Sequence, residues 1–358
     1  MNLPRGPLRT STGGEPPFPS VGVAFLLTFG AIVAGGLVGL LFIELGPLAA
    51  EGIGTAIGIG GVATLAARRV AEPQGARIGL VALEWRACFL ILCLVPAVLV
   101  ASELDNFAYD WSPAPATETS AAATATATSS TSDAATATPA TKAGEARAPG
   151  EAATTTNAAA ADEAVAKSDA SAPADRTGAT RSKAEEPETP DLLIDPDDPF
   201  SLMEGLIVAV GIAPVIHEFL FRGVLQQGLV TQLGLVRGVT LTALLWTMLR
   251  PVPSASPARF AAAFVAWFAM GWLLGMVRIA TGSILGSILL ASLWASVGFA
   301  SLALAGRVEV PGMNVDGTHL PVAVTIASLL IVAWAAWKTL EKANAAGVSG
   351  PGRIPSVD

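Results

Sequence analysis

Long runs of apolar side chains are the feature that most constrains the fold of this chain. A helix needs about 20 mostly apolar residues to cross the hydrocarbon core of a bilayer, and Val21 to Ile43 form such a run without a charge. A cleaved signal peptide fits less well, because its apolar region is typically about 7–15 residues long. The whole chain is 52% hydrophobic and only 14% charged, against about 25% charged residues in a typical soluble domain. The sequence therefore predicts membrane-spanning helices.

Seven further apolar runs follow the first one. Together they predict an all-α, multi-pass transmembrane bundle of about eight spans, with Pro214 expected to bend the fourth. The further runs cover 52–67, 78–101, 202–230, 238–249, 260–277, 283–305 and 320–337.

A long acidic insertion separates the first three spans from the rest. Between Glu103 and Phe200 there are 18 acidic and 6 basic residues, a net charge of −12. The whole chain has a net charge of −8, so the rest of the chain has a net charge of +4. Thr, Ala, Ser and Pro dominate from Trp111 to Pro190, and such a segment buries too little apolar surface to offset the entropy of ordering. We expect a disordered tether; a folded extracytoplasmic domain is the alternative.

These patterns divide the chain into five parts. In order they are an N-terminal tail, a three-helix membrane block, the disordered acidic tether, a membrane core and a C-terminal tail. The expected boundaries are 1–20, 21–103, 104–200, 201–340 and 341–358.

Basic residues in the short loops predict the orientation, because Lys and Arg are retained on the cytoplasmic side. Assigning them to that side places both termini in the cytoplasm and residues 104–200 outside the cell, with the protein in the inner (cell) membrane. The residues used for this assignment are Arg5, Arg9, Arg68, Arg69, Arg77, Arg237, Arg278, Lys338 and Lys342.

Three ionisable side chains lie close together inside the fourth span. An ionisable residue at membrane depth costs at least about 2.5–3.5 kcal/mol, so His217, Glu218 and Arg222 need an explanation. Glu218 and Arg222 are four residues apart and share one helix face, where they can form an ion pair. His217 points about 100° away around the helix. One interpretation is a purely structural pair that fixes helix register; the other is a functional site.

The surrounding pattern resembles the first motif of the CPBP family of intramembrane CAAX-type proteases and bacteriocin-processing or immunity proteins. In that family an Ala-Pro step leads into Glu-Glu-x-x-x-Arg, usually followed by Gly. The resemblance extends more loosely over 202–298. The matching positions are Ala213, Pro214, His217, Glu218, Phe221, Arg222, Gly223 and Leu225.

The same resemblance implies further motifs, and here the chain departs from the family. His217 stands where the family has its first Glu, the residue assigned to activate water. The second motif, Phe-x-x-x-His, corresponds to Trp246 and Arg250. The third motif places His and Asn four residues apart, where this chain has Ala291 and Ala295. Only Glu218 and Arg222 are unchanged, so the candidate catalytic positions are His217, Glu218, Arg222, Trp246 and Arg250.

These substitutions limit the chemistry. The hydrolysis that the family resemblance implies needs a carboxylate and imidazoles around one water, as base and as oxyanion donors. Arg250 is unsuited to act as a base, because a guanidinium does not deprotonate in proteins. A catalytic zinc ion generally needs three protein ligands, and the second histidine, His319, is far along the chain. We therefore expect no cofactor and no metal site.

Three functional hypotheses follow. The first is a CPBP-like protease homologue with impaired catalysis that binds or regulates a membrane partner. The second is an active, diverged intramembrane endopeptidase that uses Glu218 as its base, with His217 and Arg250 in altered roles. The third is a small-solute transporter. The expected surroundings are the lipid bilayer and a membrane-embedded protein or peptide, with no nucleic acid.

Overall fold

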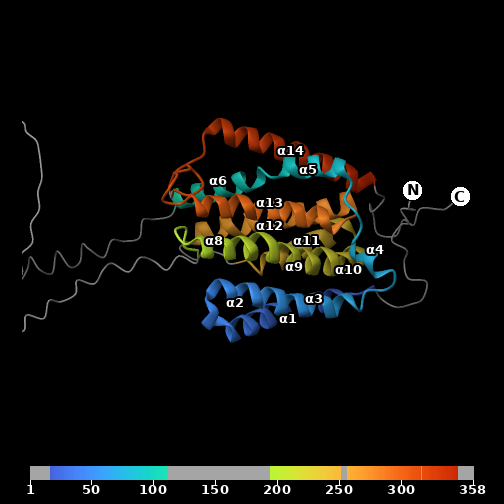
Figure 1. The fold of residues 1–358 in the computed structure, drawn as a ribbon. Coiled ribbons are helices and arrows are strands. Elements are labelled where there is room, and N and C mark those ends of the chain that lie inside the picture. The colour runs from blue at the N-terminus through green and yellow to red at the C-terminus, as the bar shows by residue number, and fades with distance from the viewer. Residues whose placement is uncertain (1–16, 112–193, 251–255, 316, 346–358) are drawn as a thin grey trace, which may run out of the picture. The chain divides into compact units, whose positions relative to one another are not determined.

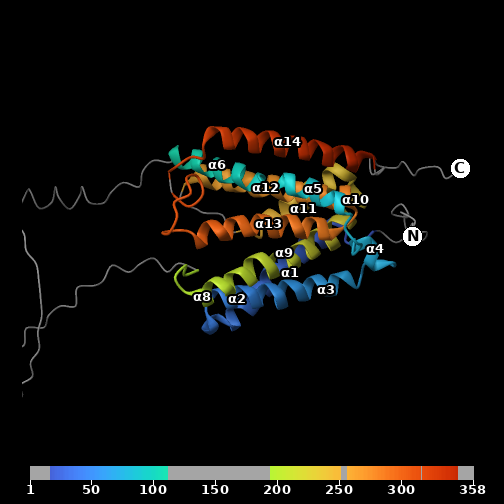
Figure 2. The ribbon, with the colours of Figure 1, turned by 45° about the horizontal axis from the view of Figure 1, so that its top comes forward.

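The computed structural model describes residues 17–111, 194–250, 256–315 and 317–345. These residues form one bundle of long helices that run roughly alongside one another (Figures 1 and 2). In both views α1, α2 and α3 lie along one edge, and α5, α6 and α14 lie along the opposite edge. Helices α9 to α13 fill the space between them. The predicted tether, apart from its ends, lies outside the described residues.

Helices account for nearly all of the regular structure in the described residues. The N-terminal block contains α1 (Val21–Leu41), α2 (Pro47–Ile53), the π-helical turn η2 (Gly54–Ile59), α3 (Gly60–Ala67), α4 (Gln74–Ile78), α5 (Trp85–Leu94) and α6 (Ala97–Asp110). The second block contains α8 (Pro199–Gly205), the π-helical turn η3 (Leu206–Ile212), α9 (Ala213–Glu218), the π-helical turn η4 (Phe219–Leu225), α10 (Gln226–Leu233), α11 (Leu235–Thr247), α12 (Pro257–Thr281), α13 (Ile284–Ala303) and α14 (Val322–Ala345).

The predicted all-α, multi-pass membrane fold is confirmed. Among the described residues, seven helical stretches are long and apolar enough to cross a membrane, and Leu235–Thr247 is a shorter apolar helix at the place of the predicted fifth span. The third span differs from its expected range of 78–101 and runs from Trp85 to Asp110. Its helix starts late because the chain turns at Gly79, where φ is +86°, a left-handed conformation that favours glycine. The chain then continues without helical structure to Glu84.

Contacts between helices define the two ends of the bundle. Gln227 and Gln232, on α10, donate hydrogen bonds to the carbonyls of Phe18 and Pro17 (2.7 and 2.9 Å). Ala343, near the end of α14, packs beside α10 and α11. We call this the α4 end. At the other end, the α8 end, Arg307 pairs with Asp197 (2.9 Å). Helix α6 ends and helix α8 begins at this α8 end (Figure 1).

Glycine allows α1 and η2 to pack backbone against backbone. A Cβ atom added to Gly54 would lie 2.5 Å from the carbonyl oxygen of Gly35, and one added to Gly58 would lie 2.5 Å from that of Ala34. Small residues four apart let membrane helices approach this closely. The two glycine-rich spans of the N-terminal block therefore pack against each other.

This close approach makes Gly54→Ala destabilising. Alanine normally favours a helix by about 0.5–1 kcal/mol over glycine, but at Gly54 its Cβ would force two backbones apart, an overpacking that costs about 1–3 kcal/mol. Gly36→Ala is the matched control, since nothing lies within 4 Å of a Cβ there. We expect a lower unfolding midpoint in mixed micelles for Gly54→Ala and an unchanged or higher one for Gly36→Ala. Equal midpoints for the two variants would contradict the packing.

A histidine between two carboxylates fastens the loop before α14 to α6. Nδ1 of His319 lies 2.6 Å from Glu103, and Nε2 lies 2.8 Å from Asp110. The second oxygen of Glu103 accepts the backbone N–H of Leu320 (3.0 Å). Arg259 at the start of α12 pairs with Asp105 of α6 (2.8 Å). These contacts join α6, α12 and the 304–321 loop at the α8 end.

His319 makes this junction sensitive to pH. Hydrogen bonds to Asp110 and Glu103 raise the pKa of His319 above its usual 6.5. Its folded pKa exceeds the unfolded one, so the stabilisation is complete below about pH 6.5 and is lost as the pH rises through the folded pKa. We expect the unfolding midpoint of the wild type to fall towards that of His319→Gln between about pH 6 and 9. Lys338→Gln, which removes an exposed pair with Glu341, should keep the wild-type slope; parallel curves for wild type and His319→Gln would refute the prediction.

Candidate functional site

The continuous helix Pro199–Leu233, called the motif helix here, carries the first motif and alternates between α-helical and π-helical segments. Two π-helical turns, η3 and η4, flank α9, which carries His217 and Glu218. Pro214 lacks an N–H, and its ring would clash with the carbonyl of Val210 in a regular α-helix. The wider turn at η3 accommodates this ring, and the chain stays helical through Pro214. Such π-turns are frequent at functional sites, and here they set the directions in which the charged side chains point.

Glu218 and Arg222 form an ion pair with no exposure to solvent. Their side chains are 0% exposed, and Oε1 of Glu218 lies 2.9 Å from Nη1 of Arg222. Glu218 is about 22 Å from the end of α10 and about 28 Å from the start of α8, at 1.5 Å per residue. The pair therefore lies deep in the bundle, where a single unpaired charge would be strongly destabilising.

Helix α12 completes the coordination of the arginine. Nη2 of Arg222 donates to the carbonyl of Gly271 (2.6 Å), and one turn later Nε2 of Gln226 donates to the carbonyl of Gly275 (2.9 Å). Both glycines lie where a Cβ would meet a neighbour: one at Gly271 would be 2.9 Å from Trp246. Sequence reasoning missed Gln226, Gly271 and Gly275. The four-residue spacing shared by the two donors and the two glycines was the available signal.

The residues expected from the second motif lie beside this pair. The ring of Trp246, 2% exposed, has the guanidinium carbons of Arg222 and Arg250 at 5.0 and 4.2 Å from its centroid. His217 is 8% exposed and interacts electrostatically with Arg250 and Arg222. The ring of Trp246 thus lies between the Arg222 of the first motif, which pairs with Glu218, and the Arg250 of the second.

The third motif contributes only packing. Ala291 on α13 is 8% exposed and lies in the same apolar cluster as Leu220, Phe221 and Trp246. The neighbouring hydroxyl of Ser287 lies near Glu218 but donates to the carbonyl of Ile284 (3.0 Å). Among the described residues, no three His, Cys, Asp or Glu side chains gather as metal ligands.

The segment between α3 and α5, in the N-terminal block, packs against one side of the motif helix. Ile78 lies against Gly223, where a Cβ would come within 2.9 Å of its side chain. Three hydrogen bonds hold this loop to the other block: Arg278 to the carbonyl of Arg77, Ile284 N–H to that of Gly79, and Ser283 to that of Val81 (3.2, 3.0 and 2.6 Å). The glycine after Arg222 is therefore required by a neighbour 145 positions earlier in the chain.

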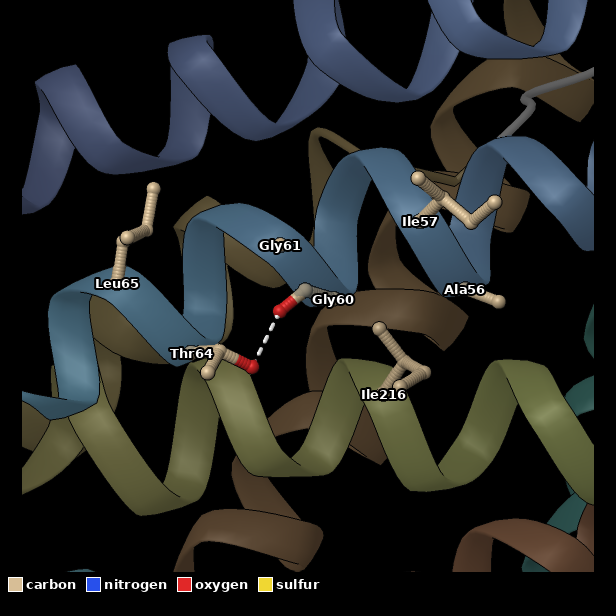
Figure 3. A pocket seen from close by; sticks show the side chains of 7 residues that line it. All are labelled: Ala56, Ile57, Gly60, Gly61, Thr64, Leu65 and Ile216. Atoms are coloured by element: carbon tan, nitrogen blue, oxygen red, sulfur yellow. Dashed lines mark hydrogen bonds between the residues drawn. The ribbon is translucent and has the colours of Figure 1, made fainter.

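A groove next to the motif is apolar. It has a volume of about 430 Å³ and lies between η2, α3 and α9, with Ile216 on its α9 side (Figure 3). Its one hydroxyl, that of Thr64, donates to the carbonyl of Gly60 (2.8 Å). The groove is lined by Ile216 and not by His217 or Glu218, so it does not open onto the ion pair.

Comparison with known families identifies this part of the chain. Residues 199–297, from α8 into α13, match the family model described as type II CAAX prenyl endopeptidase Rce1-like. This stretch is an Rce1-like domain, which confirms the resemblance of this part of the chain to CAAX-type intramembrane proteases. No curated protein and no solved structure matches the chain.

The buried pair predicts a specific pattern of stabilities. Arg222→Met leaves the buried Glu218 without its ion-pair and hydrogen-bond partner and should cost about 3–5 kcal/mol, whereas Glu218→Leu combined with Arg222→Met should cost much less. Arg307→Met, which breaks an exposed pair with Asp197, should cost at most about 1 kcal/mol. Unfolding in mixed micelles measures all three, and a double variant less stable than the single one would contradict this account.

Proposed function

We propose that this protein is a CAAX-type intramembrane protease homologue with impaired catalysis, which binds or regulates a membrane-embedded partner. The single observation that carries the proposal is the state of Glu218. Its carboxylate is fully buried and bound to Arg222, and Ala291 occupies the neighbouring position where the family resemblance implies a histidine.

The chemistry of these residues supports impairment. A general base must lie within hydrogen-bond reach of the group it deprotonates, whereas Oε1 of Glu218 is engaged by Arg222 and its side chain has no exposure to solvent. General-base catalysis alone is typically worth about 10²–10⁴-fold. Arg250, in place of the second-motif histidine, is unable to accept a proton. Alanine at 291 and 295 supplies neither a base nor an oxyanion donor. Complete burial of Glu218 and Arg222 also gives no support to a transporter path through them.

The surroundings of this function are the lipid bilayer, since the protein is a multi-pass membrane protein. We further propose that the α4 end faces the cytoplasm and the α8 end faces outward in the inner membrane. The basic residues support this orientation, because Arg68 and Arg69 follow α3 and Arg77 lies in α4, which places all three at the α4 end. The end of α6 and the start of α8, between which the acidic segment runs in the sequence, lie at the other end.

Cleavage of membrane peptides tests the proposal. We expect the full-length protein in proteoliposomes to release no more product from a transmembrane peptide library than Glu218→Gln does. A variant that restores the family residues, His217→Glu with Arg250→His, Ala291→His and Ala295→Asn, should raise cleavage by at least about 10²-fold if it folds. Mass spectrometry of the products provides the measurement.

One result would contradict the proposal of impaired catalysis. Cleavage by the wild type that disappears in Glu218→Gln would establish the alternative, an active diverged endopeptidase that uses Glu218 as its base.

A further inference from the structure

The charges at mid-depth do not balance. Two guanidiniums, Arg222 and Arg250, share one buried carboxylate, that of Glu218, and Arg222 takes the direct ion pair. Within the described part of the chain, Arg250 makes no side-chain hydrogen bond or ion pair, and its Nε is buried without a partner. Glu218 and the exposed Glu51 act on it only through longer-range electrostatics. The cluster therefore keeps an excess positive charge.

Two tryptophans hold this arginine in place. The guanidinium carbon of Arg250 lies 4.2 Å from the ring centroid of Trp246 and 5.3 Å from that of Trp267, and the two rings meet edge to face at 6.0 Å. Cation–π contacts are stronger where the cation is desolvated, so these two contacts offset part of the cost of an arginine at membrane depth. The side chain is only half-buried, so its guanidinium is fixed in direction and still open to a ligand.

We propose that Arg250 is the receptor for a carboxylate carried by a membrane-embedded peptide, either an Asp or Glu side chain or a free C-terminus. This proposal rests on the proposed partner-binding function and names the chemistry of that partner. A planar guanidinium pairs with a carboxylate through two parallel hydrogen bonds. Such a ligand supplies the negative charge that the cluster lacks.

The depth of Arg250 favours a peptide over a lipid headgroup. Arg250 contacts Trp267, which lies ten residues into α12 (Pro257–Thr281). At 1.5 Å per residue Arg250 is therefore about 15 Å from the α8 end of α12. Lipid phosphates lie in the interfacial region outside the hydrocarbon core. A peptide helix, in contrast, places a carboxylate at any depth.

A small probe tests the site in the full-length protein. We expect sodium hexanoate, at ten times its dissociation constant, to raise the unfolding midpoint in neutral micelles by about 3 °C, and hexanamide, its uncharged counterpart, to leave it unchanged. Arg250→Gln should abolish the shift, and Arg250→Lys, which keeps the charge without the fork, should reduce it. Arg307→Gln, an exposed arginine outside the cluster, is the control and should respond like the wild type.

Peptide probes distinguish the two carboxylate sources. In phosphatidylcholine vesicles, energy transfer measures binding of a Leu/Ala helix with a central Glu against the same helix with Gln, and of a short helix with a free C-terminus against its amidated form. We expect at least about a tenfold preference for the charged member of one pair, lost in Arg250→Gln. The pair that shows it identifies the source.

Three results would overturn the proposal. One is an equal response to hexanoate and hexanamide, and another is a hexanoate shift that persists in Arg250→Gln. The third is an Arg250-dependent shift caused by phosphatidylglycerol with no preference in either peptide pair, which would assign the site to a lipid headgroup. Glu218-dependent cleavage would refute the proposed function separately, because these binding measurements do not depend on it.

Discussion

The ion pair between Glu218 and Arg222 is the interaction on which the middle of this bundle depends. Neither side chain reaches solvent, so each charge is tolerable only while the other is present. Arg222 also takes the carbonyl of Gly271, which fixes α12 against the motif helix, and it stands beside the ring of Trp246 on α11. One guanidinium thus joins three helices at a depth where no water competes for its donors.

Much of the fold could be predicted because span length and the pairing of Glu218 with Arg222 are local properties of the sequence. Hydropathy failed where apolar residues are not helical: the stretch around Leu80 and Leu83 is as apolar as a span, but Gly79 turns the chain and its carbonyl binds another helix. The partners of Arg222 and Gln226 were not predictable either. Every residue has a backbone carbonyl, so the sequence does not show which carbonyl will accept a hydrogen bond. The role of the two glycines can be recognised only when α12 is known to pack beside the motif helix.

The substitutions at the candidate site all remove side chains that the family resemblance assigns to catalysis. Where the family resemblance implies two histidines and an asparagine, this chain has Arg250, Ala291 and Ala295, so polar groups of the implied site are exchanged for a fixed positive charge and for apolar side chains. Trp246 suits this arrangement, because its electron-rich face is shared by two cations that would otherwise repel each other. These exchanges are what the proposed loss of catalysis and the proposed carboxylate site both rest on.

The contact between Ile78 and Gly223 has a consequence for how this protein can change. The family domain begins at residue 199, yet the surface beside its glycine is completed by a loop that precedes it by more than a hundred residues. A side chain at position 223 would require Ile78 to shift or to be replaced by a smaller residue, so the sizes of these two residues are coupled. If residues 199–297 were transferred alone into another membrane protein, the surface at Gly223 would lose the side chain of Ile78 that covers it. The packing unit is therefore larger than the stretch that matches the family model, because the loop before the third span completes its surface.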